Sequence, residues 1–182
     1  MSGRNVSCSL APIAVVGSAY AVEYLSVQRA QQLLFPDADF FREHHVILTS
    51  GQKKEIRKVS GRKQRWDKQR AWEAWQGQRF AGWFLIDDVI GKHEFITYAT
   101  AVSPEGSVLG VEIMNYRETH GGEVRGEEWR MHFLNKMVSD PFKLDVDIPN
   151  ISGATLSCRN VTDGVKRLLA VWETVLKRER HE

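Results

Sequence analysis

Cysteine, proline and long apolar runs are scarce in this chain, which has two cysteines and five prolines among 182 residues. Two cysteines cannot build a disulfide framework, so the fold must depend on a hydrophobic core, for which 42% hydrophobic residues with six tryptophans suffice. The sequence contains no internal repeat or low-complexity tract, and a chain of this length is expected to form one domain. The net charge of +2 indicates no particular partner.

Familiar catalytic spacings are also missing. The histidines show no metal-ligand spacing, because His44 and His45 are adjacent, His93 and His120 lie far apart, and His132 has no second ligand four residues on. Neither a Ser-His-Asp arrangement nor a glycine-rich phosphate loop can be argued from the sequence. The sequence therefore predicts neither a metal site nor a hydrolase.

Residues 1–21 have the pattern of a secretory signal peptide. Arg4 precedes an apolar stretch from Leu10 to Val16, and Ala-Tyr-Ala at 19–21 is the small-residue pattern that signal peptidase cleaves. Cleavage there predicts a soluble chain that is periplasmic or otherwise exported. Its one cysteine, Cys158, is either a redox thiol or, more commonly for such a residue, buried. An uncleaved anchor and a short buried helix are alternatives, although the stretch is far shorter than the ~20 residues that span a bilayer.

Apolar spacing predicts two helices near the start of the mature chain. Residues 26–35 are expected to form a helix that Pro36 ends, and residues 46–49 a brief extended segment. A second helix is expected from Thr49 or Ser50 to about Val59, with Gly61 ending it. The polar, tryptophan-rich stretch 65–78 is expected to be a loop or an irregular helix.

Strand patterns follow in the second half of the chain. Residues 83–90, 94–102 and 108–116 predict three strands of an antiparallel meander. Residues 126–138 are expected to form a helix that Asp140-Pro141 ends, and residues 156–178 a final helix. The expected buried stripe of that helix consists of Val161, Val165, Leu168, Leu169, Trp172 and Val175. The predicted fold class is α+β, with a small antiparallel sheet packed against helices in a single domain.

Charge is unevenly distributed along the chain. Residues 53–79 include ten basic and three acidic residues, whereas residues 87–128 include nine acidic and three basic ones. Such polarity can orient a charged redox partner, or bring the basic face to anionic lipid headgroups in a peripheral membrane association. Trp66, Trp72 and Trp75 could stack bases within the basic segment. A solvated face is the default for such a run, and an exported protein rarely meets nucleic acid, so no nucleic-acid partner is predicted.

The segment most suggestive of chemistry is 151–157, of sequence ISGATLS, directly before the final helix. Thr155 would lie at the helix N-terminus, where unpaired N–H groups and the helix dipole stabilise an anion by roughly 0.3–2 kcal/mol. Gly153 can adopt left-handed backbone angles, and Ala154 leaves room for close approach. The same residues also suit an ordinary loop and N-cap.

The string SGATLS, followed by apolar residues at helical spacing, resembles the flavinylation site of the FMN-binding domain family. That family includes the FMN-carrying subunits of the sodium-pumping NADH:quinone reductase and of the Rnf complexes. The resemblance implies that Thr155 carries FMN through a phosphoester bond, which a flavin transferase forms from FAD with magnesium. It also assigns the turn to Ser152, Gly153, Ala154 and Leu156, and contacts with phosphate oxygens to Ser157.

Residues 110–122 resemble a second family element, in which a strand ends in Glu-Thr and a glycine-containing turn. The resemblance implies that Glu118, Thr119, Gly121 and Gly122 contact the isoalloxazine side of FMN. His120 stands where the family has proline, which leaves a local effect on the flavin's potential open. Because two elements occur in the expected order, the resemblance is more specific than either motif alone.

One departure bears on covalent attachment, and His93 bears on the pocket. The family motif has Asp three residues before its Ser, whereas this chain has Pro149 there and its nearest acid at Asp147. The same fold holding FMN without a covalent bond is therefore an alternative. His93 opens a predicted strand, where it either lines the pocket or is an ordinary surface histidine.

The sequence thus predicts a signal peptide at 1–21, a helical or irregular extension at 22–80 and an FMN-binding domain at 81–182. The resemblance implies an exported flavoprotein that carries electrons rather than one with its own substrate, with a flavin transferase and a redox protein of the cell envelope as partners. A covalent tether would prevent loss of the flavin outside the cytoplasm. A non-enzymatic envelope interaction module, using the basic 53–79 face and binding no flavin, is the alternative from a different class.

Overall fold

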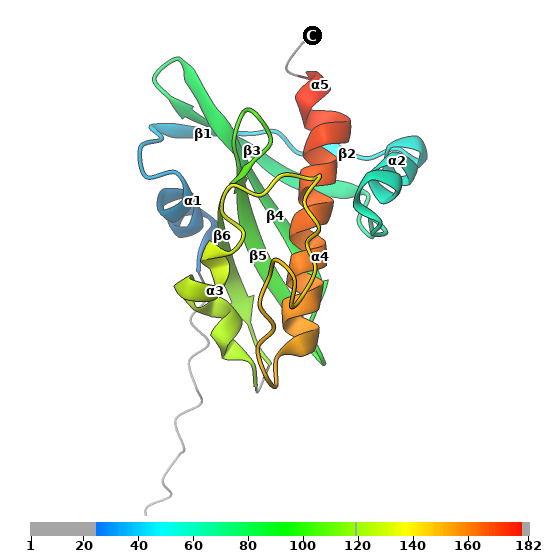
Figure 1. Cartoon of the computed structure of the whole chain (residues 1–182). Coiled ribbons are helices and arrows are strands. Elements are labelled where there is room, and N and C mark those ends of the chain that lie inside the picture. The colour runs from blue at the N-terminus through cyan, green and yellow to red at the C-terminus, as the bar shows by residue number, and fades with distance from the viewer. Residues whose placement is uncertain (1–24, 119, 180–182) are drawn as a thin grey trace, which may run out of the picture.

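The computed structural model describes residues 25–118 and 120–179 (Figure 1). The predicted signal peptide, with Cys8, and the predicted site residue Thr119 lie outside the described residues. In chain order the elements are α1 (Val27–Leu34), β1 (Phe40–Glu43), β2 (Val46–Ile47), α2 (Ser50–Ser60), β3 (Lys68–Gln76), β4 (Arg79–Ile90), β5 (Phe95–Val102), β6 (Val108–Tyr116), the 3-10 turn η1 (Gly122–Arg125), α3 (Glu127–Met131), α4 (Thr155–Val171), the π-helical turn η2 (Trp172–Leu176) and α5 (Lys177–Glu179).

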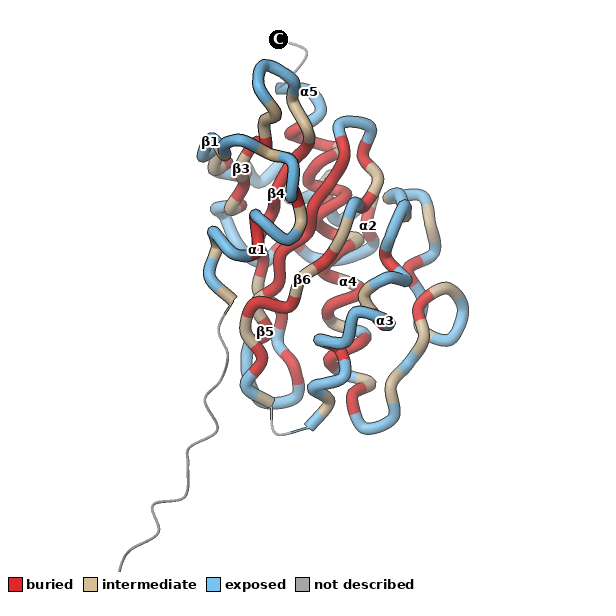
Figure 2. The backbone as a smooth tube through the Cα atoms, turned by 90° about the vertical axis from the view of Figure 1, so that its left-hand side faces the viewer, coloured by how far each residue is buried: buried red, intermediate tan, exposed pale blue. Residues whose placement is uncertain are grey.

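One antiparallel sheet organises these elements. Its strand order is β1-β3-β4-β5-β6, and β2 pairs with β3 beside that path. β4, β5 and β6 form the predicted meander, which confirms the α+β class with an antiparallel sheet. α4 packs against β4 and β5, while α1 packs against β5 and β6 (Figure 1). The buried residues follow the strands and α4 (Figure 2).

Local signals place the ends of the first two helices where the sequence predicts them. The Ser26 side chain caps α1 by accepting a hydrogen bond from the backbone N–H of Arg29. Thr49 and Gln52 form a reciprocal capping box at the start of α2, and Gly61 ends that helix in a left-handed conformation. The predicted buried stripe of the last helix is confirmed, since all six of its residues are buried.

The prediction of a loop or irregular helix at 65–78 was wrong, because most of this stretch forms β3. Its polar side chains find partners on neighbouring strands: Arg42 of β1 bonds Glu73, and Arg70 bonds Asp88 of β4 at 2.6 Å. Trp72 packs edge-to-face on Phe84. The predicted boundary between the extension at 22–80 and the domain at 81–182 therefore falls inside strand β4 of the sheet.

The predicted helix at 126–138 was wrong beyond Met131, where α3 ends. Asn135 adopts a positive φ of 62°, which breaks the helical path. The chain instead pairs with the start of β6, because the Asn135 N–H donates to the Val108 carbonyl at 2.8 Å and the Val108 N–H to that of Lys136 at 2.9 Å. These bonds cover an otherwise open part of the β6 edge.

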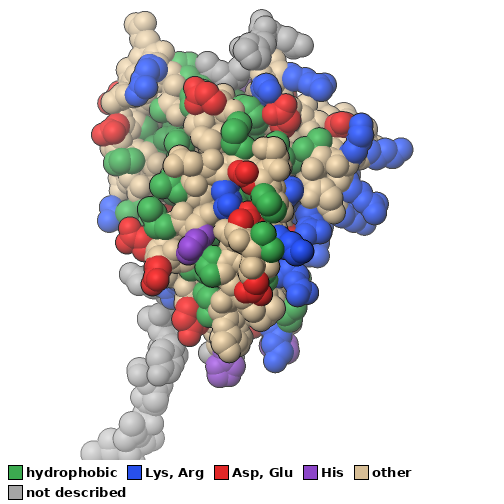
Figure 3. Space-filling view, viewed as in Figure 1, with side chains coloured by type: hydrophobic (Ala, Val, Ile, Leu, Met, Phe, Trp, Pro, Cys, Tyr) green, Lys and Arg blue, Asp and Glu red, His purple; other side chains and the backbone are tan. Residues whose placement is uncertain are grey.

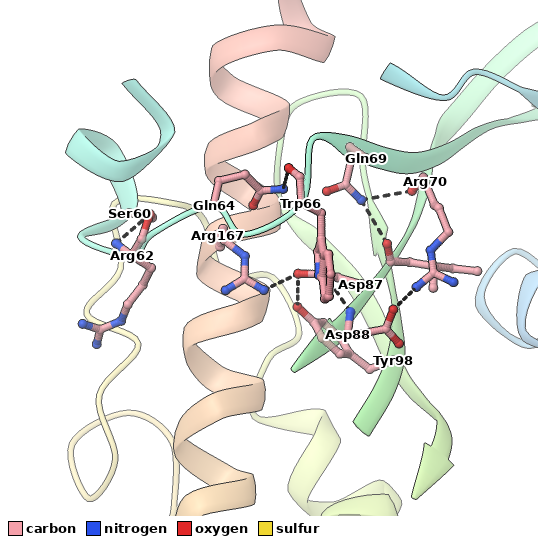
Figure 4. Close-up of polar contacts among 11 residues, drawn as sticks. Ser60, Arg62, Gln64, Trp66, Gln69, Arg70, Asp87, Asp88, Tyr98 and Arg167 are labelled. Carbon is pink, nitrogen blue, oxygen red and sulfur yellow. Dashed lines mark hydrogen bonds and ion pairs between the residues drawn. The ribbon is translucent and has the colours of Figure 1, made fainter. Parts of the chain in front are cut away.

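A buried ion pair anchors the middle of the last helix to the sheet (Figure 4). Arg167 of α4 donates to Asp87 of β4, and Tyr98 of β5 donates to the same carboxylate at 3.2 Å. Burial raises the pKa of Tyr98 well above its ordinary value of 10.0, and the charge of Asp87 raises it further. Gly164 allows this approach, since a Cβ there would lie 2.2 Å from the Tyr98 hydroxyl. Within the described ranges, no helix combines the length and apolar character needed to cross a bilayer.

Candidate functional site

The two segments emphasised by the sequence meet at one cavity of about 460 Å³. It lies at the N-terminus of α4, between the first turn of that helix, the end of β6 and the β4–β5 hairpin. Its lining residues are Lys92, His93, Glu118, His120, Gly153, Ala154, Thr155, Leu156 and Ser157. The volume lies within the range of roughly 300–1,000 Å³ typical of small-molecule sites.

The start of α4 leaves its backbone donors open to a ligand. Thr155 is the first helical residue, and Ala154 at the N-cap position provides no side-chain hydrogen bond. Because the first N–H groups of a helix have no carbonyl partner within it, they can serve an anion at the cavity wall. Gly153 turns the chain into the helix with a φ of +82°, a conformation that favours glycine. The Thr155 side chain is half-buried at this wall.

Gly121 brings the β6 element against the turn that precedes α4. Its φ is +83°, and a Cβ at this position would lie 2.6 Å from the Ala154 Cβ and 2.7 Å from the Tyr116 hydroxyl. The neighbouring Gly122 has no such constraint, because nothing lies within 4 Å of a Cβ placed there. Gly121 therefore packs behind the cavity wall and lets the two elements approach each other.

Tyr116 joins three pieces of the site. Its hydroxyl donates to the His120 carbonyl at 2.6 Å and lies 3.2 Å from the Ser157 hydroxyl. Burial raises the pKa of Tyr116, so the phenol stays protonated at neutral pH. The end of β6, the loop that carries His120 and the first turn of α4 are thereby held together.

Glu118 fixes the hairpin that forms the opposite wall. Its carboxylate accepts hydrogen bonds from the backbone N–H groups of His93 at 2.6 Å and Glu94 at 3.0 Å. Burial opposes its ionisation, but these bonds and one from Lys92 outweigh that effect and lower the pKa of Glu118. Asn160 of α4 adds a bond to the Ile90 carbonyl at 2.6 Å. Lys92 and His93 are thus held at the cavity by backbone contacts.

The structure brings most of the predicted site residues to the cavity, but not all of them. Glu118 and the segment Gly153–Ser157 line it, whereas Ser152 is exposed in the preceding turn. Gly121 lies behind Ala154, and Gly122 begins η1. Lys92 is a lining residue that sequence reasoning missed. Its only sequence signal is its place beside His93, between two predicted strands.

The acid nearest the motif is part of the loop's own structure. Asp147 accepts hydrogen bonds from the Lys136 ammonium at 2.9 Å and from the backbone N–H groups of Phe142 at 3.0 Å and Lys143 at 2.6 Å. Although burial opposes ionisation, these bonds lower the pKa of Asp147. The carbonyl of Pro149, which stands where the family has Asp, accepts a hydrogen bond from the Trp129 indole N–H at 2.8 Å. Asp147 therefore does not replace the missing acid as a free surface carboxylate.

Two further sequence expectations concern Cys158 and the basic segment. Cys158 is fully buried beneath the first turn of α4, and burial raises its pKa, so it is a packed thiol rather than a reactive one. Lys and Arg side chains gather on the side of the molecule where α2 lies (Figure 3). Trp72 packs on Phe84 and Trp75 stacks on Phe40, so these rings are committed to the sheet.

Comparisons with known proteins agree with the geometry. Residues 91–170 match the sequence model of the FMN-binding domain family, and this range includes every residue that lines the cavity. The fold is similar to the crystal structure of NqrC from Shewanella oneidensis, with a TM-score of 0.58 and 15% identity over 87% of this chain and 91% of that one. At this identity the similarity concerns the fold alone. A search of curated proteins finds no match.

Proposed function

We propose that this chain is an electron-transfer flavoprotein that binds FMN, with the FMN joined to Thr155 by a phosphoester bond. The match of residues 91–170 to the FMN-binding domain family supports FMN as the cofactor. The observation that carries the proposal is the meeting of both sequence elements at one cavity whose wall includes Thr155. The NqrC-like fold supports it at the level of architecture.

The residues present fit the cofactor. Bound FMN supplies electron transfer, because its ring system can accept and donate one or two electrons. The open N–H groups at the start of α4 suit a phosphate, and Gly121 and Ala154 bring two chain segments close together without side chains that would fill the cavity. Lys92, His93 and His120 add cationic or polar groups to the cavity wall. The protein's part is to hold and orient the flavin and to restrict its access to water.

Covalent attachment would require a flavin transferase that uses FAD and magnesium, and we include it among the proposed partners. The Thr155 hydroxyl supports this step because it belongs to a half-buried residue at an open cavity rather than to the core. Pro149 implies that the transferase acts here without an acid at the usual position. FMN held in the same cavity without a bond is the rival mode of binding.

Expression with and without a flavin transferase separates the two modes. With the enzyme, we expect flavin fluorescence to stay with the protein band in a denaturing gel and the intact mass to rise by one esterified FMN. Thr155→Ala should lose this signal completely, and Thr155→Ser should retain part of it because a hydroxyl remains. Ser139→Ala is the control, since Ser139 is an exposed hydroxyl residue outside the motif and does not line the cavity.

Pigment that leaves the protein on denaturation would establish the non-covalent mode. An equal covalent load on Thr155→Ala would contradict the assignment of Thr155. Purified protein without absorbance near 450 nm, even after addition of FMN, would contradict flavin binding altogether and favour the interaction module instead.

We also propose that the chain works outside the cytoplasm and exchanges electrons with a protein of the cell envelope. The support for export is the sequence pattern at residues 1–21. The basic face gives a physical reason for docking an acidic redox partner, since Arg65 and Lys68 make no ion pair within the described part of the chain and Trp66 beside them is 41% exposed. Intact mass of the protein from its native host tests export, because cleavage after Ala21 removes residues 1–21.

A further inference from the structure

A second hollow, of about 290 Å³, adjoins the start of α4. Its walls come from the loop 142–150, from α4 itself and from Arg62 in the segment after α2. Among the described residues, Thr155 is the one that lines both this hollow and the larger cavity. The two spaces therefore meet at the side chain proposed to carry the flavin.

The hollow has more positive than negative charge. Arg62, Lys143 and Arg159 line it together with Asp145 and Asp163. Arg62 pairs with Asp163 at 2.7 Å, which neutralises one acid. Lys143 and Arg159 form no ion pair with any residue in the described ranges. Their charges are thus available to an anion.

A buried hydroxyl in the wall has no hydrogen-bond partner among the described residues. Thr162 is 1% exposed, and its hydroxyl makes no hydrogen bond within the part of the chain that the structure describes. Threonine within a helix commonly bonds back to a carbonyl of the preceding turn, but this hydroxyl does not. Because an unsatisfied buried polar group is unfavourable, a ligand oxygen in the hollow would relieve it.

We propose that this second hollow is a phosphate site in which Arg159 and Lys143 supply charge and Thr162 donates a hydrogen bond. The inference rests on the proposed function in one respect, namely that the phosphate of FMN is its first candidate ligand. Phosphate from a free source has the same chemistry and is the second candidate. With the flavin ring in the larger cavity, Thr155 marks the place where a phosphate can enter the second hollow. Arg62 lies outside the family match at 91–170, so the N-terminal part of this chain contributes to the site.

The test compares FMN with riboflavin, which lacks the phosphate. Protein made without a flavin transferase is titrated with each flavin while flavin fluorescence is followed. We expect FMN to bind about ten- to a hundredfold more tightly than riboflavin, since charge-assisted hydrogen bonds contribute on that order. The Lys143→Gln/Arg159→Gln double variant should weaken FMN binding by about tenfold and leave riboflavin unchanged. Thr162→Val, which keeps the side-chain shape, should give a smaller selective loss.

Arg29→Gln/Lys54→Gln is the matched control, because this double substitution also removes two positive charges and both residues are exposed and line neither hollow. Inorganic phosphate serves as the second probe, with binding followed by calorimetry. Competition of phosphate with FMN, but not with riboflavin, assigns the hollow to the flavin's own phosphate. Binding of phosphate that depends on Arg159 without such competition supports the site and assigns it to a free phosphate.

Two outcomes separate this inference from the proposed function. Equal affinities for FMN and riboflavin, with no phosphate binding, would overturn the phosphate site while leaving flavin binding intact. Failure of both flavins to bind would overturn the proposed function, whereas phosphate binding that is lost in the double variant would still support the second hollow. Folding of each variant is checked by its far-ultraviolet circular dichroism.

Discussion

The first turn of α4 and the middle of the same helix differ in their surroundings, because the first turn borders open space whereas the middle packs against the sheet. At its start no side chain caps the backbone, and two hollows adjoin Thr155. In the middle, Arg167 is buried on Asp87, and Leu168 and Leu169 are fully buried. The difference indicates that two parts of one helix have different roles. The middle anchors it to the sheet, and this lets the first turn keep donors free for a ligand.

Removing the anchor should have the largest effect on stability. Asp87→Asn leaves the Arg167 charge buried without its partner, so we expect a loss of about 3–5 kcal/mol in the free energy of unfolding, measured by urea denaturation. The control is Glu173→Gln, whose pair with Lys177 lies on the surface and should contribute about 0.5 kcal/mol or less. Equal effects of the two variants would show that the buried pair is no special anchor.

The same comparison predicts how function responds. Thr155→Ala should leave the free energy of unfolding nearly unchanged, because Thr155 is half-buried and its hydroxyl has no partner essential to the core. Asp87→Asn should retain the ability to take up FMN in the molecules that remain folded. A large loss of stability in Thr155→Ala would mean that the two regions are not independent.

Gly121 tests the contact between the two elements of the site, with an intermediate effect. Gly121→Ala adds a methyl where Ala154 and Tyr116 leave no room and where φ is positive, so a destabilisation of about 1–3 kcal/mol with weaker flavin binding is expected. Thermal and urea unfolding with flavin titration measure both. Gly122→Ala is the matched control, because a Cβ there meets nothing within 4 Å. If the two variants behave alike, close approach at Gly121 is not what shapes the cavity.

Glu118 should give the smallest effect, and a pH-dependent one. Its folded pKa is lower than its ordinary value of 4.5, so the folded state favours the carboxylate and gains stability above the unfolded pKa. That gain is lost as the pH falls through the folded pKa. Because the residue is only partly buried, Glu118→Gln should cost about 1 kcal/mol at neutral pH.

Unfolding experiments at about pH 7 and in steps to lower pH measure this difference, which should shrink as the pH falls through the folded pKa of Glu118 and vanish once residue 118 is neutral in both proteins. A cost that is the same at both values would indicate lost packing rather than lost charge.

Much of the fold follows from local signals. The capping box at Thr49 and Gln52, the left-handed Gly61 and the strand patterns from residue 83 onward all act within a few residues. β3 escaped prediction because its charged residues look solvent-exposed in sequence, whereas Glu73 is buried against Arg42 from another strand. The end of α3 escaped because Asn135 pairs with Val108, which lies 27 positions earlier in the chain.

In the candidate site, too, some features follow from local sequence and others depend on contacts between distant segments. The helix start at Thr155 follows from residue types and from a family resemblance, so sequence alone could identify it. Lys92 and the second hollow depend on contacts between distant segments. Glu118 sets the hairpin that holds Lys92, while Arg62 and Thr162 meet only when α2 and α4 are in place. No spacing in the sequence indicates those meetings.

The hydrogen bond from the Trp129 indole to the Pro149 carbonyl has a practical consequence. It attaches a buried fluorophore to the segment that leads into the turn before α4. Loosening of that segment would free the indole and shift its emission towards the red, and a nearby yellow pigment would quench it. Tryptophan fluorescence would thus report how much flavin the protein carries, without any added label.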